Sequence, residues 1–215
     1  MRTVAVVGGT GRLGFGLAVR LARAGYRVII GSRLAEKAAA AAARAGLPEV
    51  VVPVAGAANR PAAAQSDLVI LTIPFAGQSA ILADVRDAVR GKVVVDTTVP
   101  LRQVRPPKLE MIAVGSAAQA AQALLPEARV VAGFHTVGEA LVARVDEPLD
   151  GDVLICGDDP AAKGAVAELA GAIGLRAVDA GGLTEAATLE RLAVLVIGLN
   201  QRYRRRAIGV RFTGL

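Results

Sequence analysis

The stretch VAVVGGTGRLGFGLAVRLARAGYRVIIGSR, from Val4 to Arg33, decides the fold of this chain. It opens with the apolar run Val4–Val7, which is typical of a buried strand, and a second such run lies at Arg27–Ile30. Between the two runs, apolar side chains recur at the spacing of one helical face, at Leu13, Leu17 and Leu21. The stretch therefore predicts strand, turn, helix and strand, the opening unit of a doubly wound α/β sheet.

The turn between the first strand and the helix carries three glycines, Gly9, Gly11 and Gly14, in the spacing G-x-G-x-x-G. One glycine permits the tight turn, the second lets the backbone approach a pyrophosphate, and the third lets the helix pack closely on the strand. The phosphates then meet free N–H groups at the positive end of the helix dipole. With a strand on each side of its helix, this motif predicts a dinucleotide site.

The end of the second strand indicates which dinucleotide is bound. A site for NAD usually places Asp or Glu there, where it accepts hydrogen bonds from the ribose 2′-hydroxyl. This chain instead has Ser32 and Arg33, with Lys37 one helical turn beyond and Thr10 in the glycine turn. Hydroxyls and two cations suit a 2′-phosphate, so the sequence predicts NADP. The alternative is that Ser32 caps the next helix while both cations are solvated, and capping is compatible with phosphate binding.

The composition is that of a tightly packed α/β protein. Of 215 residues, 53% are hydrophobic and 3% aromatic, which suits a sheet covered by alanine-rich helices. The net charge of +6 comes from scattered basic residues without aromatics for base stacking, so no nucleic acid partner is expected. The longest apolar run, Leu192–Leu199, is too short to cross a bilayer, and no signal peptide is expected. We therefore expect a cytoplasmic protein without a membrane partner, in which Cys156 is a buried structural thiol.

The rest of the chain alternates between strand and helix patterns at the rhythm of right-handed crossovers. Further strands are expected at Val50–Val54, Leu68–Ile73, Lys92–Val95 and Val130–Gly133. Helices are expected at Leu34–Ala45, Ala57–Gln65, Gln78–Val89 and Ser116–Leu124, and an irregular segment at Leu101–Val114. The predicted fold class is α/β, a Rossmann-type, doubly wound and mainly parallel sheet.

A smaller α/β part is expected to follow the main sheet. Its predicted order is a strand at Val153–Cys156, a helix at Ala161–Ile173, a strand at Arg176–Val178 and a long helix from Leu183 to Arg206. We therefore divide the chain into an NADP-binding Rossmann domain, residues 1–150, and a small C-terminal domain, residues 151–215.

Ligands of doubly wound folds bind outside the carboxyl ends of the strands, and three such ends carry candidate contact residues. These ends are the segments Thr72–Phe75, Asp96–Pro100 and Phe134–Val137. Pro74 and Pro100 are expected to stop their strands and to shape the loops beneath a nicotinamide. His135 is the only histidine of the chain, and it is either a hydrogen-bonded structural residue or a member of the site.

Several chemistries lack the residues that they need. Asp159 followed by Pro160 is typical of a helix N-cap, and one histidine with one cysteine cannot form a zinc site. There is no G-x-S-x-G motif, and none of the four lysines is placed as an acid or base at a nicotinamide. Hydride transfer to an alcohol or ketone needs such a group, whereas transfer between two nicotinamide-like or flavin-like rings does not. Cofactor-to-cofactor transfer is therefore the expected reaction.

A set of motifs runs almost from end to end of the chain: GGTGRLGFGLAVRLARAG, IIGSR, LTIPF, VVVDTTVPL, GSAAQ, GFHTV, CGDD, DAG and the closing GVRF. With them the chain resembles the NADPH-dependent reductases of coenzyme F420, the F420H2:NADP oxidoreductases. The resemblance implies an enzyme that transfers hydride reversibly between NADP(H) and the deazaflavin coenzyme F420. It also implies a homodimer, with residues 151–215 contributing to the deazaflavin site and the dimer interface.

Together with the glycine motif, the resemblance assigns residues to the two coenzymes. It implies that the glycine turn and the end of the second strand hold NADP, through Gly9, Thr10, Gly11, Arg12, Leu13, Gly14, Ser32, Arg33 and Lys37. Near the nicotinamide it places Thr72, Ile73, Pro74, Val99 and Pro100. The deazaflavin stacks near His135, Thr136 and Val137, with His135 as the catalytic candidate and Ile208 as a further expected contact.

Two questions stay open at this stage. The phosphate and glutamate tail of the coenzyme is anionic and has candidate partners in Arg102, Arg105 and Lys108, although a solvated loop explains these cations better. The alternatives to a deazaflavin reductase are an NADPH-dependent flavin or ferric reductase and an NADP sensor without catalysis.

Overall fold

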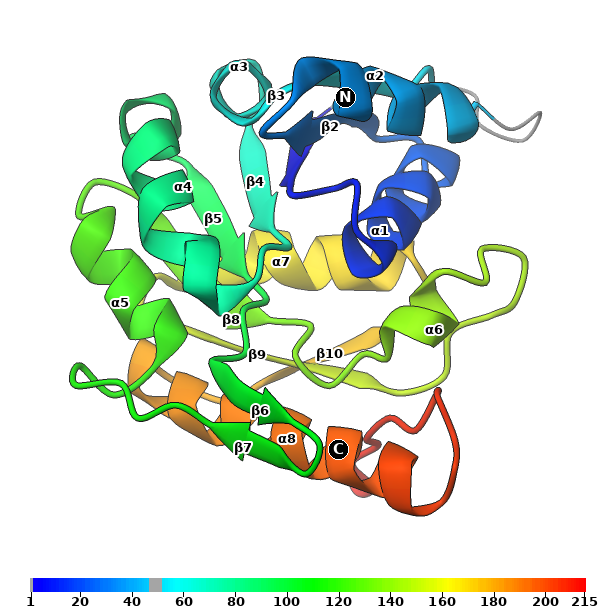
Figure 1. Ribbon diagram of the computed structural model, residues 1–215, viewed down its shortest axis with the longest axis vertical. Coiled ribbons are helices and arrows are strands. Elements are labelled where there is room, and N and C mark those ends of the chain that lie inside the picture. Colours follow the sequence, from blue (N-terminus) through cyan, green and yellow to red (C-terminus); the bar gives the residue numbers. More distant parts are fainter. Residues whose placement is uncertain (1, 47–51) are drawn as a thin grey trace.

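The computed structural model describes residues 2–46 and 52–215, and its centre is a sheet of eight strands (Figure 1). The strands are β1 (Thr3–Val7), β2 (Arg27–Ser32), β3 (Ala55–Ala58), β4 (Leu68–Leu71), β5 (Val93–Asp96), β8 (Arg129–Gly133), β9 (Asp152–Gly157) and β10 (Arg176–Asp179). Their order is β10-β9-β8-β5-β4-β1-β2-β3, and every neighbouring pair is parallel except β8 and β9. The predicted mainly parallel, doubly wound sheet is confirmed.

Helices cover both faces of this sheet. They are α1 (Arg12–Arg23), α2 (Ala35–Arg44), α3 (Asn59–Ala64), α4 (Gln78–Val85), α5 (Ala117–Leu124), α6 (Glu139–Val142), α7 (Pro160–Ala172) and α8 (Ala186–Arg202), with short 3-10 turns at Phe75–Gly77, Arg86–Val89 and Leu183–Glu185. Helices α1, α2 and α7 share one buried cluster with the sheet, and α3, α4, α5 and α8 share the other.

Alternation of side chains along each strand produces these two clusters. Val4 and Val6 pack in the first cluster and Ala5 and Val7 in the second, because successive side chains of a strand face opposite ways. Strand β4 is apolar and buried at every position, as expected for a strand covered on both faces. The carboxyl ends of β1, β2, β4, β5 and β8 meet at one edge of the sheet because these strands are parallel.

One strand forms later in the chain than its sequence pattern indicates. The prediction at Val50–Val54 falls partly on residues 50 and 51, which lie outside the described residues, and residues 52–54 are not strand. Strand β3 spans Ala55–Ala58 instead, paired with β2. A Cβ on Gly56 would come within 2.4 Å of the backbone of Ala38. Close contact with α2, which only glycine permits, therefore favours this segment over the valine-rich one.

The segment Leu101–Val114, expected to be irregular, begins with an antiparallel hairpin. Its strands are β6 (Leu101–Val104) and β7 (Pro107–Leu109). Nε2 of Gln201, on α8, donates a hydrogen bond to the carbonyl oxygen of Val104 at 2.7 Å. Figure 1 shows the hairpin beside α8, at the end of the molecule opposite to α2 and α3. The irregular prediction is wrong here because a tertiary contact, absent from any local pattern, holds the hairpin in place.

The strand–helix–strand unit predicted after residue 150 is present as β9, α7 and β10. Cys156 lies buried in β9, and burial raises the pKa of its thiol to about 12, as expected of a structural cysteine. Asp159 caps α7 by accepting a hydrogen bond from the N–H of Ala162 at 2.8 Å. Among the described residues, no group of His, Cys, Asp and Glu side chains is arranged to hold a metal ion.

The long C-terminal helix is shorter than predicted. A 3-10 turn occupies Leu183–Glu185, and α8 ends at Arg202 rather than at Arg206. Strands β9 and β10 continue the main sheet, and a division of the chain into two domains near residue 150 stays a prediction. No helix in residues 2–46 and 52–215 is both long and apolar enough to span a membrane.

A buried arginine joins α1 to the short helix α6, which the sequence did not predict. Arg20 donates from Nε to the carbonyl oxygen of Val142 at 3.0 Å, and from Nη2 to those of Arg144 at 2.6 Å and Glu147 at 2.9 Å. Burial lowers the pKa of Arg20, and these carbonyl partners compensate for the lost hydration. They thereby fix the segment that follows β8 against the helix of the glycine turn.

Candidate functional site

The glycine turn between β1 and α1 excludes side chains at several positions. A Cβ on Gly9 would meet the carbonyl oxygen of Val6 at 2.7 Å, and one on Gly14 would meet Oγ1 of Thr72 at 2.4 Å. Gly8, which the motif did not single out, has a φ of +77° and is equally enclosed. Gly11 caps α1 without a side-chain hydrogen bond, so the first N–H groups of the helix stay available. This backbone cradle fits a pyrophosphate.

Two free cations lie at the carboxyl end of β2. Ser32 is buried there, and its Oγ accepts a hydrogen bond from the N–H of Leu34 at 3.3 Å. Arg33 and Lys37 are exposed, and neither side chain has an ion-pair or hydrogen-bond partner within the described part of the chain. Thr10, in the glycine turn, is exposed as well. Ser32 does not cap the next helix, because the N-cap of α2 is Leu34, without a side-chain cap hydrogen bond. Both cations are available for a phosphate.

A cavity of about 1140 Å³ adjoins the glycine turn. It is bounded by the carboxyl ends of β4, β5 and β8 and by α6, α8 and the hairpin. The residues predicted for the coenzymes that line it are Arg12, Leu13, Thr72, Ile73, Val99, His135, Thr136 and Val137. The predicted residues outside its lining are Gly9, Thr10, Gly11, Gly14, Ser32, Arg33, Lys37, Pro74, Pro100 and Ile208. The fold therefore brings the three selected strand ends to one cavity.

One wall of this cavity comes from segments in which the sequence singled out Arg105, as a candidate partner of the coenzyme tail, and no other lining residue. Helix α8 and the chain after it contribute Ala193, Val196, Ile197, Asn200, Gln201, Arg204, Arg205 and Arg206. The hairpin contributes Leu101, Val104 and Arg105, and the region of α6 contributes Gly138, Glu139 and Ala140. The run of arginines after α8 was a local sign that this segment binds a ligand, but no motif connected the run with the strand ends.

His135 lines the cavity with both ring nitrogens buried. Nδ1 and Nε2 are shielded from solvent, and neither makes a hydrogen bond of ordinary geometry with any described residue. Burial lowers the pKa of the ring to about 4, and the backbone of Thr98 offsets only part of this shift. The ring is neutral near pH 7, with one N–H donor and one acceptor nitrogen, and the backbone of Thr98 interacts with it. Because of this interaction, both roles, a structural residue and a member of the site, stay predictions.

The residue before His135 has an unusual backbone conformation. Phe134, at the end of β8, is almost fully buried and has a φ of +64°, which bulky side chains rarely adopt. Its carbonyl oxygen accepts a hydrogen bond from the N–H of Val137 at 3.2 Å. Packing of the aromatic ring compensates for the backbone strain, and the resulting turn places residues 135–137 along the cavity.

Two buried carboxyl groups lie behind the cavity wall. Asp96 ends β5, and its carboxylate accepts hydrogen bonds from the N–H of Thr98 at 2.7 Å and from Nε2 of Gln78 at 2.8 Å. Glu190, on α8, accepts a hydrogen bond from the N–H of Ala117 at 2.8 Å. Because Ala117 is the first residue of α5, the bond joins α8 to a helix end where the dipole favours negative charge.

Both carboxyl groups have raised pKa values. Burial raises the pKa of Asp96 to about 6, although hydrogen bonds from Thr98 and Gln78 oppose the shift. Burial likewise raises the pKa of Glu190 to about 7, and the nearby Asp96 adds to that rise. Neither residue lines the cavity, so both act on its shape through the elements that they join.

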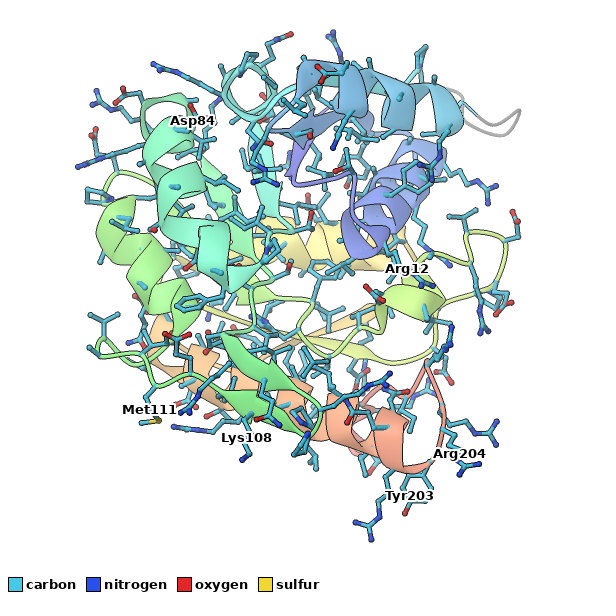
Figure 2. All side chains as sticks on the ribbon, in the orientation of Figure 1. Arg12, Asp84, Lys108, Met111, Tyr203 and Arg204 are labelled. Carbon is cyan, nitrogen blue, oxygen red and sulfur yellow. The ribbon has the colours of Figure 1, made fainter. Side chains whose placement is uncertain are left out.

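The cavity lining offers little acid–base chemistry. Apart from the neutral His135, its one carboxylate among the described residues is Glu139, whose Oε1 lies 3.7 Å from Nε of Arg12. Figure 2 shows Arg12 at the amino end of α1, close to α6. The other lining side chains are apolar, hydroxyl, amide or arginine groups. Such a surface can orient planar rings and exclude water, and it has few groups that exchange protons at neutral pH.

Comparison with known sequences gives full-length similarities. A family described as "NADP oxidoreductase coenzyme F420-dependent" matches residues 3–100. An F420-dependent NADP reductase of Methanothermobacter thermautotrophicus is 44% identical over 99% of this chain and 95% of its own length. An F420-dependent NADP reductase of Methanocaldococcus jannaschii is 38% identical over 99% of this chain and 98% of its own.

Comparison with solved structures agrees. The crystal structure of a proposed F420-dependent NADP reductase from Arthrobacter sp. FB24 superposes with a TM-score of 0.84 at 31% sequence identity. The superposition covers 99% of this chain and all of that one, so the similarity includes the hairpin and α8 as well as the glycine turn.

The raised pKa of Glu190 predicts a pH-dependent cost to stability. Its folded-state pKa of about 7 lies above the ordinary 4.5, so folding takes up a proton and the free energy of unfolding falls as pH rises through this window. Glu190→Gln keeps an acceptor oxygen for the N–H of Ala117 but cannot ionise. Relative to wild type, the variant should gain about 1–3 kcal/mol between pH 5 and pH 8 in urea unfolding.

The exposed Glu110 provides the control for this measurement. Glu110→Gln should shift stability by the same small amount at both pH values. If the difference in free energy of unfolding between Glu190→Gln and wild type does not change with pH, Glu190 ionises in the folded protein without a cost to stability.

Proposed function

This chain belongs to the family of coenzyme F420-dependent NADP oxidoreductases, and we propose that its cavity holds the two coenzymes ring to ring for direct hydride transfer. It is an oxidoreductase with NADP(H) and coenzyme F420 as its substrates. The observation that carries the proposal is the cavity of about 1140 Å³, which adjoins the glycine turn and has little acid–base chemistry in its lining. A reaction between two oriented rings needs no such group.

The NADP half of the proposal uses the glycine turn and the end of β2. Backbone N–H groups at the start of α1 bind the pyrophosphate. Arg33 and Lys37, with the hydroxyls of Thr10 and Ser32, bind the 2′-phosphate. The nicotinamide then lies in the cavity against Thr72, Ile73 and Val99, with Pro74 and Pro100 supporting the loops behind.

The deazaflavin half uses the segment after β8. A bound deazaflavin would supply C5 as the hydride acceptor for nicotinamide C4; the negative charge that hydride brings would develop on N1 and the C2 carbonyl oxygen until a proton from solvent neutralises it. His135 lines the cavity beside Thr136 and Val137, and its ring N–H would donate to this charge. Ile208 acts through Asn200, whose Oδ1 accepts the Ile208 N–H at 3.2 Å.

Direct transfer predicts that an isotopic label stays with the hydride. With NADPH deuterated at the transferred C4 position, the deuterium should appear at C5 of the reduced deazaflavin, because no proton-exchanging group intervenes. Mass spectrometry and NMR of the product check this. Loss of the label to water would contradict the proposal, and turnover only with FMN or ferric citrate would favour a flavin or ferric reductase.

The same assay tests His135. His135→Ala should slow deazaflavin reduction by about tenfold and retain the label, less than the loss of a dominant donor, because neighbouring backbone N–H groups share the charge. The Kd of NADPH should stay near that of wild type. A variant with unchanged kinetics and a lower Tm would instead identify a structural histidine.

Arg33 should set the preference for NADPH over NADH. Arg33→Ala should weaken NADPH binding by about 1.5–3 kcal/mol, the range for a hydrogen bond to a charged group, and leave NADH nearly unchanged. Isothermal titration with both nucleotides checks this. Arg86→Ala, at an exposed arginine far from β2, is the control. Equal weakening of both nucleotides by Arg33→Ala would contradict a role at the 2′-phosphate.

We also propose that the enzyme is a homodimer through the outer face of α8 and the hairpin. Large apolar side chains lie exposed along it, with Met111 90% exposed and Leu195 and Tyr203 each more than half exposed. Figure 2 shows Met111 and Tyr203 along this edge of the molecule. Apolar groups left together on a surface favour an interface, and a second copy of the chain would cover them.

The dimer predicts a mass of twice the 21.9 kDa chain in light scattering. Leu195→Glu should convert the protein to a monomer, because a charge in the centre of an apolar interface loses its hydration without a partner. Leu124→Glu, at an exposed leucine on α5, is the matched control and should stay dimeric. A wild-type protein that runs as a monomer would contradict the proposal.

A further inference from the structure

Four arginines at the edge of the cavity have no acidic partner. All four line the cavity and are exposed: Arg105 from the hairpin, and Arg204, Arg205 and Arg206 from the chain after α8. None of them forms an ion pair with a residue that the structure describes. The carboxylate of Glu139 lies beside Arg12 instead. We call these four residues the arginine rim, and their positive charge is not compensated by the protein.

The end of α8 has a geometry that arranges three of these arginines in succession. The N–H of Arg205 donates to the carbonyl oxygen of Asn200 at 2.8 Å, and the N–H of Arg204 donates to that of Gln201 at 3.3 Å. These are the two hydrogen bonds of a Schellman motif. Oδ1 of Asn200 also accepts the N–H of Ile208 at 3.2 Å, so the chain is fixed on both sides of the arginines.

The left-handed position of this motif is occupied by Arg204, with a φ of +50°. Glycine usually takes this position because it has no Cβ to clash with the backbone. An arginine here is less favourable for the helix end than glycine would be. Such strain is commonly found where a side chain serves a ligand. Figure 2 shows Arg204 on the loop that follows α8.

Arg105 reaches the same edge through the hairpin. Nε2 of Gln201 donates to the carbonyl oxygen of Val104 at 2.7 Å, which fixes the hairpin to the last turn of α8. Nε2 of Gln103 donates to the carbonyl oxygen of Arg105, also at 2.7 Å, and fixes the backbone at Arg105 itself. Two segments distant in sequence are therefore held together with their guanidinium groups on one cavity.

We propose that the arginine rim binds the anionic tail of the deazaflavin coenzyme and selects tailed over tail-less deazaflavins. This inference rests on the proposed function, because it places the deazaflavin in the cavity. Coenzyme F420 carries a phosphodiester and glutamate carboxylates beyond its ring, and guanidinium groups bind both anions through paired N–H groups. The phosphates of NADP are assigned to the glycine turn and the end of β2, so the rim is left for the second coenzyme.

The test removes three of the four rim charges and compares two deazaflavins that differ only in the tail. One variant combines R204Q, R205Q and R206Q. The matched control combines R27Q, R86Q and R191Q, three exposed cations that do not line the cavity. KM is measured at saturating NADPH for coenzyme F420 and for the neutral 5-deazaflavin that ends at its ribityl chain, and the Kd of NADPH is measured separately.

The rim variant should raise KM for coenzyme F420 by about 10- to 100-fold, since several charge-assisted contacts are lost from an exposed site. KM for the tail-less deazaflavin should change by less than about threefold. Added salt should raise KM for coenzyme F420 less steeply in the variant than in wild type, because fewer charges remain to be screened. The control variant should behave as wild type with both substrates.

Arg204→Gly separates binding from folding. It removes one charge together with the left-handed strain, so Tm should hold or rise while KM for coenzyme F420 increases about threefold. Equal effects of the rim variant on both deazaflavins, no effect on either, or a weakening confined to NADPH would overturn the rim as a tail site. A wild-type protein that reduces neither deazaflavin would overturn the proposed function, and the rim with it.

Discussion

The hydrogen bond from the N–H of Ala117 to the carboxylate of Glu190 is the contact on which the shape of the cavity depends most. It anchors α8 at the amino end of α5, while Gln78 connects the same region to Asp96 at the end of β5. Helix α8 can then form a cavity wall opposite the glycine turn. Two carboxyl groups are buried to achieve this, and their raised pKa values measure what that burial costs. The two buried carboxyl groups therefore define the geometry of the cavity and add little to the free energy of unfolding.

The site itself contains further features that do not favour stability. Phe134 has a strained backbone, and both ring nitrogens of His135 and Oγ1 of Thr98 are buried without a hydrogen bond of ordinary geometry. Buried polar atoms in folded proteins normally have hydrogen-bond partners. Their concentration where β5 and β8 end is therefore the expected property of a surface that completes its hydrogen bonds only with a ligand.

Electrostatics divide the binding surface into two regions. Arg33 and Lys37 stand free at the end of β2, and the arginine rim stands free across the cavity, beyond α8. Between them the lining is mainly apolar, with hydroxyl groups and the neutral ring of His135. Such an arrangement suits two coenzymes whose uncharged rings meet in the middle and whose anionic groups point in opposite directions. A surface with this sign of charge also speeds the approach of anionic ligands.

Local pattern was sufficient for the parts of the protein whose structure depends on neighbouring residues. The apolar runs predicted the central strands, the three glycines predicted the turn before α1, and the polar strand ends led to His135. Ser32 and Arg33 indicated NADP because a carboxylate is absent where NAD needs one. Local pattern failed where contacts between segments distant in sequence decide the structure. Strand β3 depends on the fit of Gly56 against α2, and the hairpin depends on Gln201. The α8 wall and the arginine rim depend on Glu190 and on the turn at Arg204. Periodicity reports which side of an element is buried, and it carries no information about which other element will cover that side.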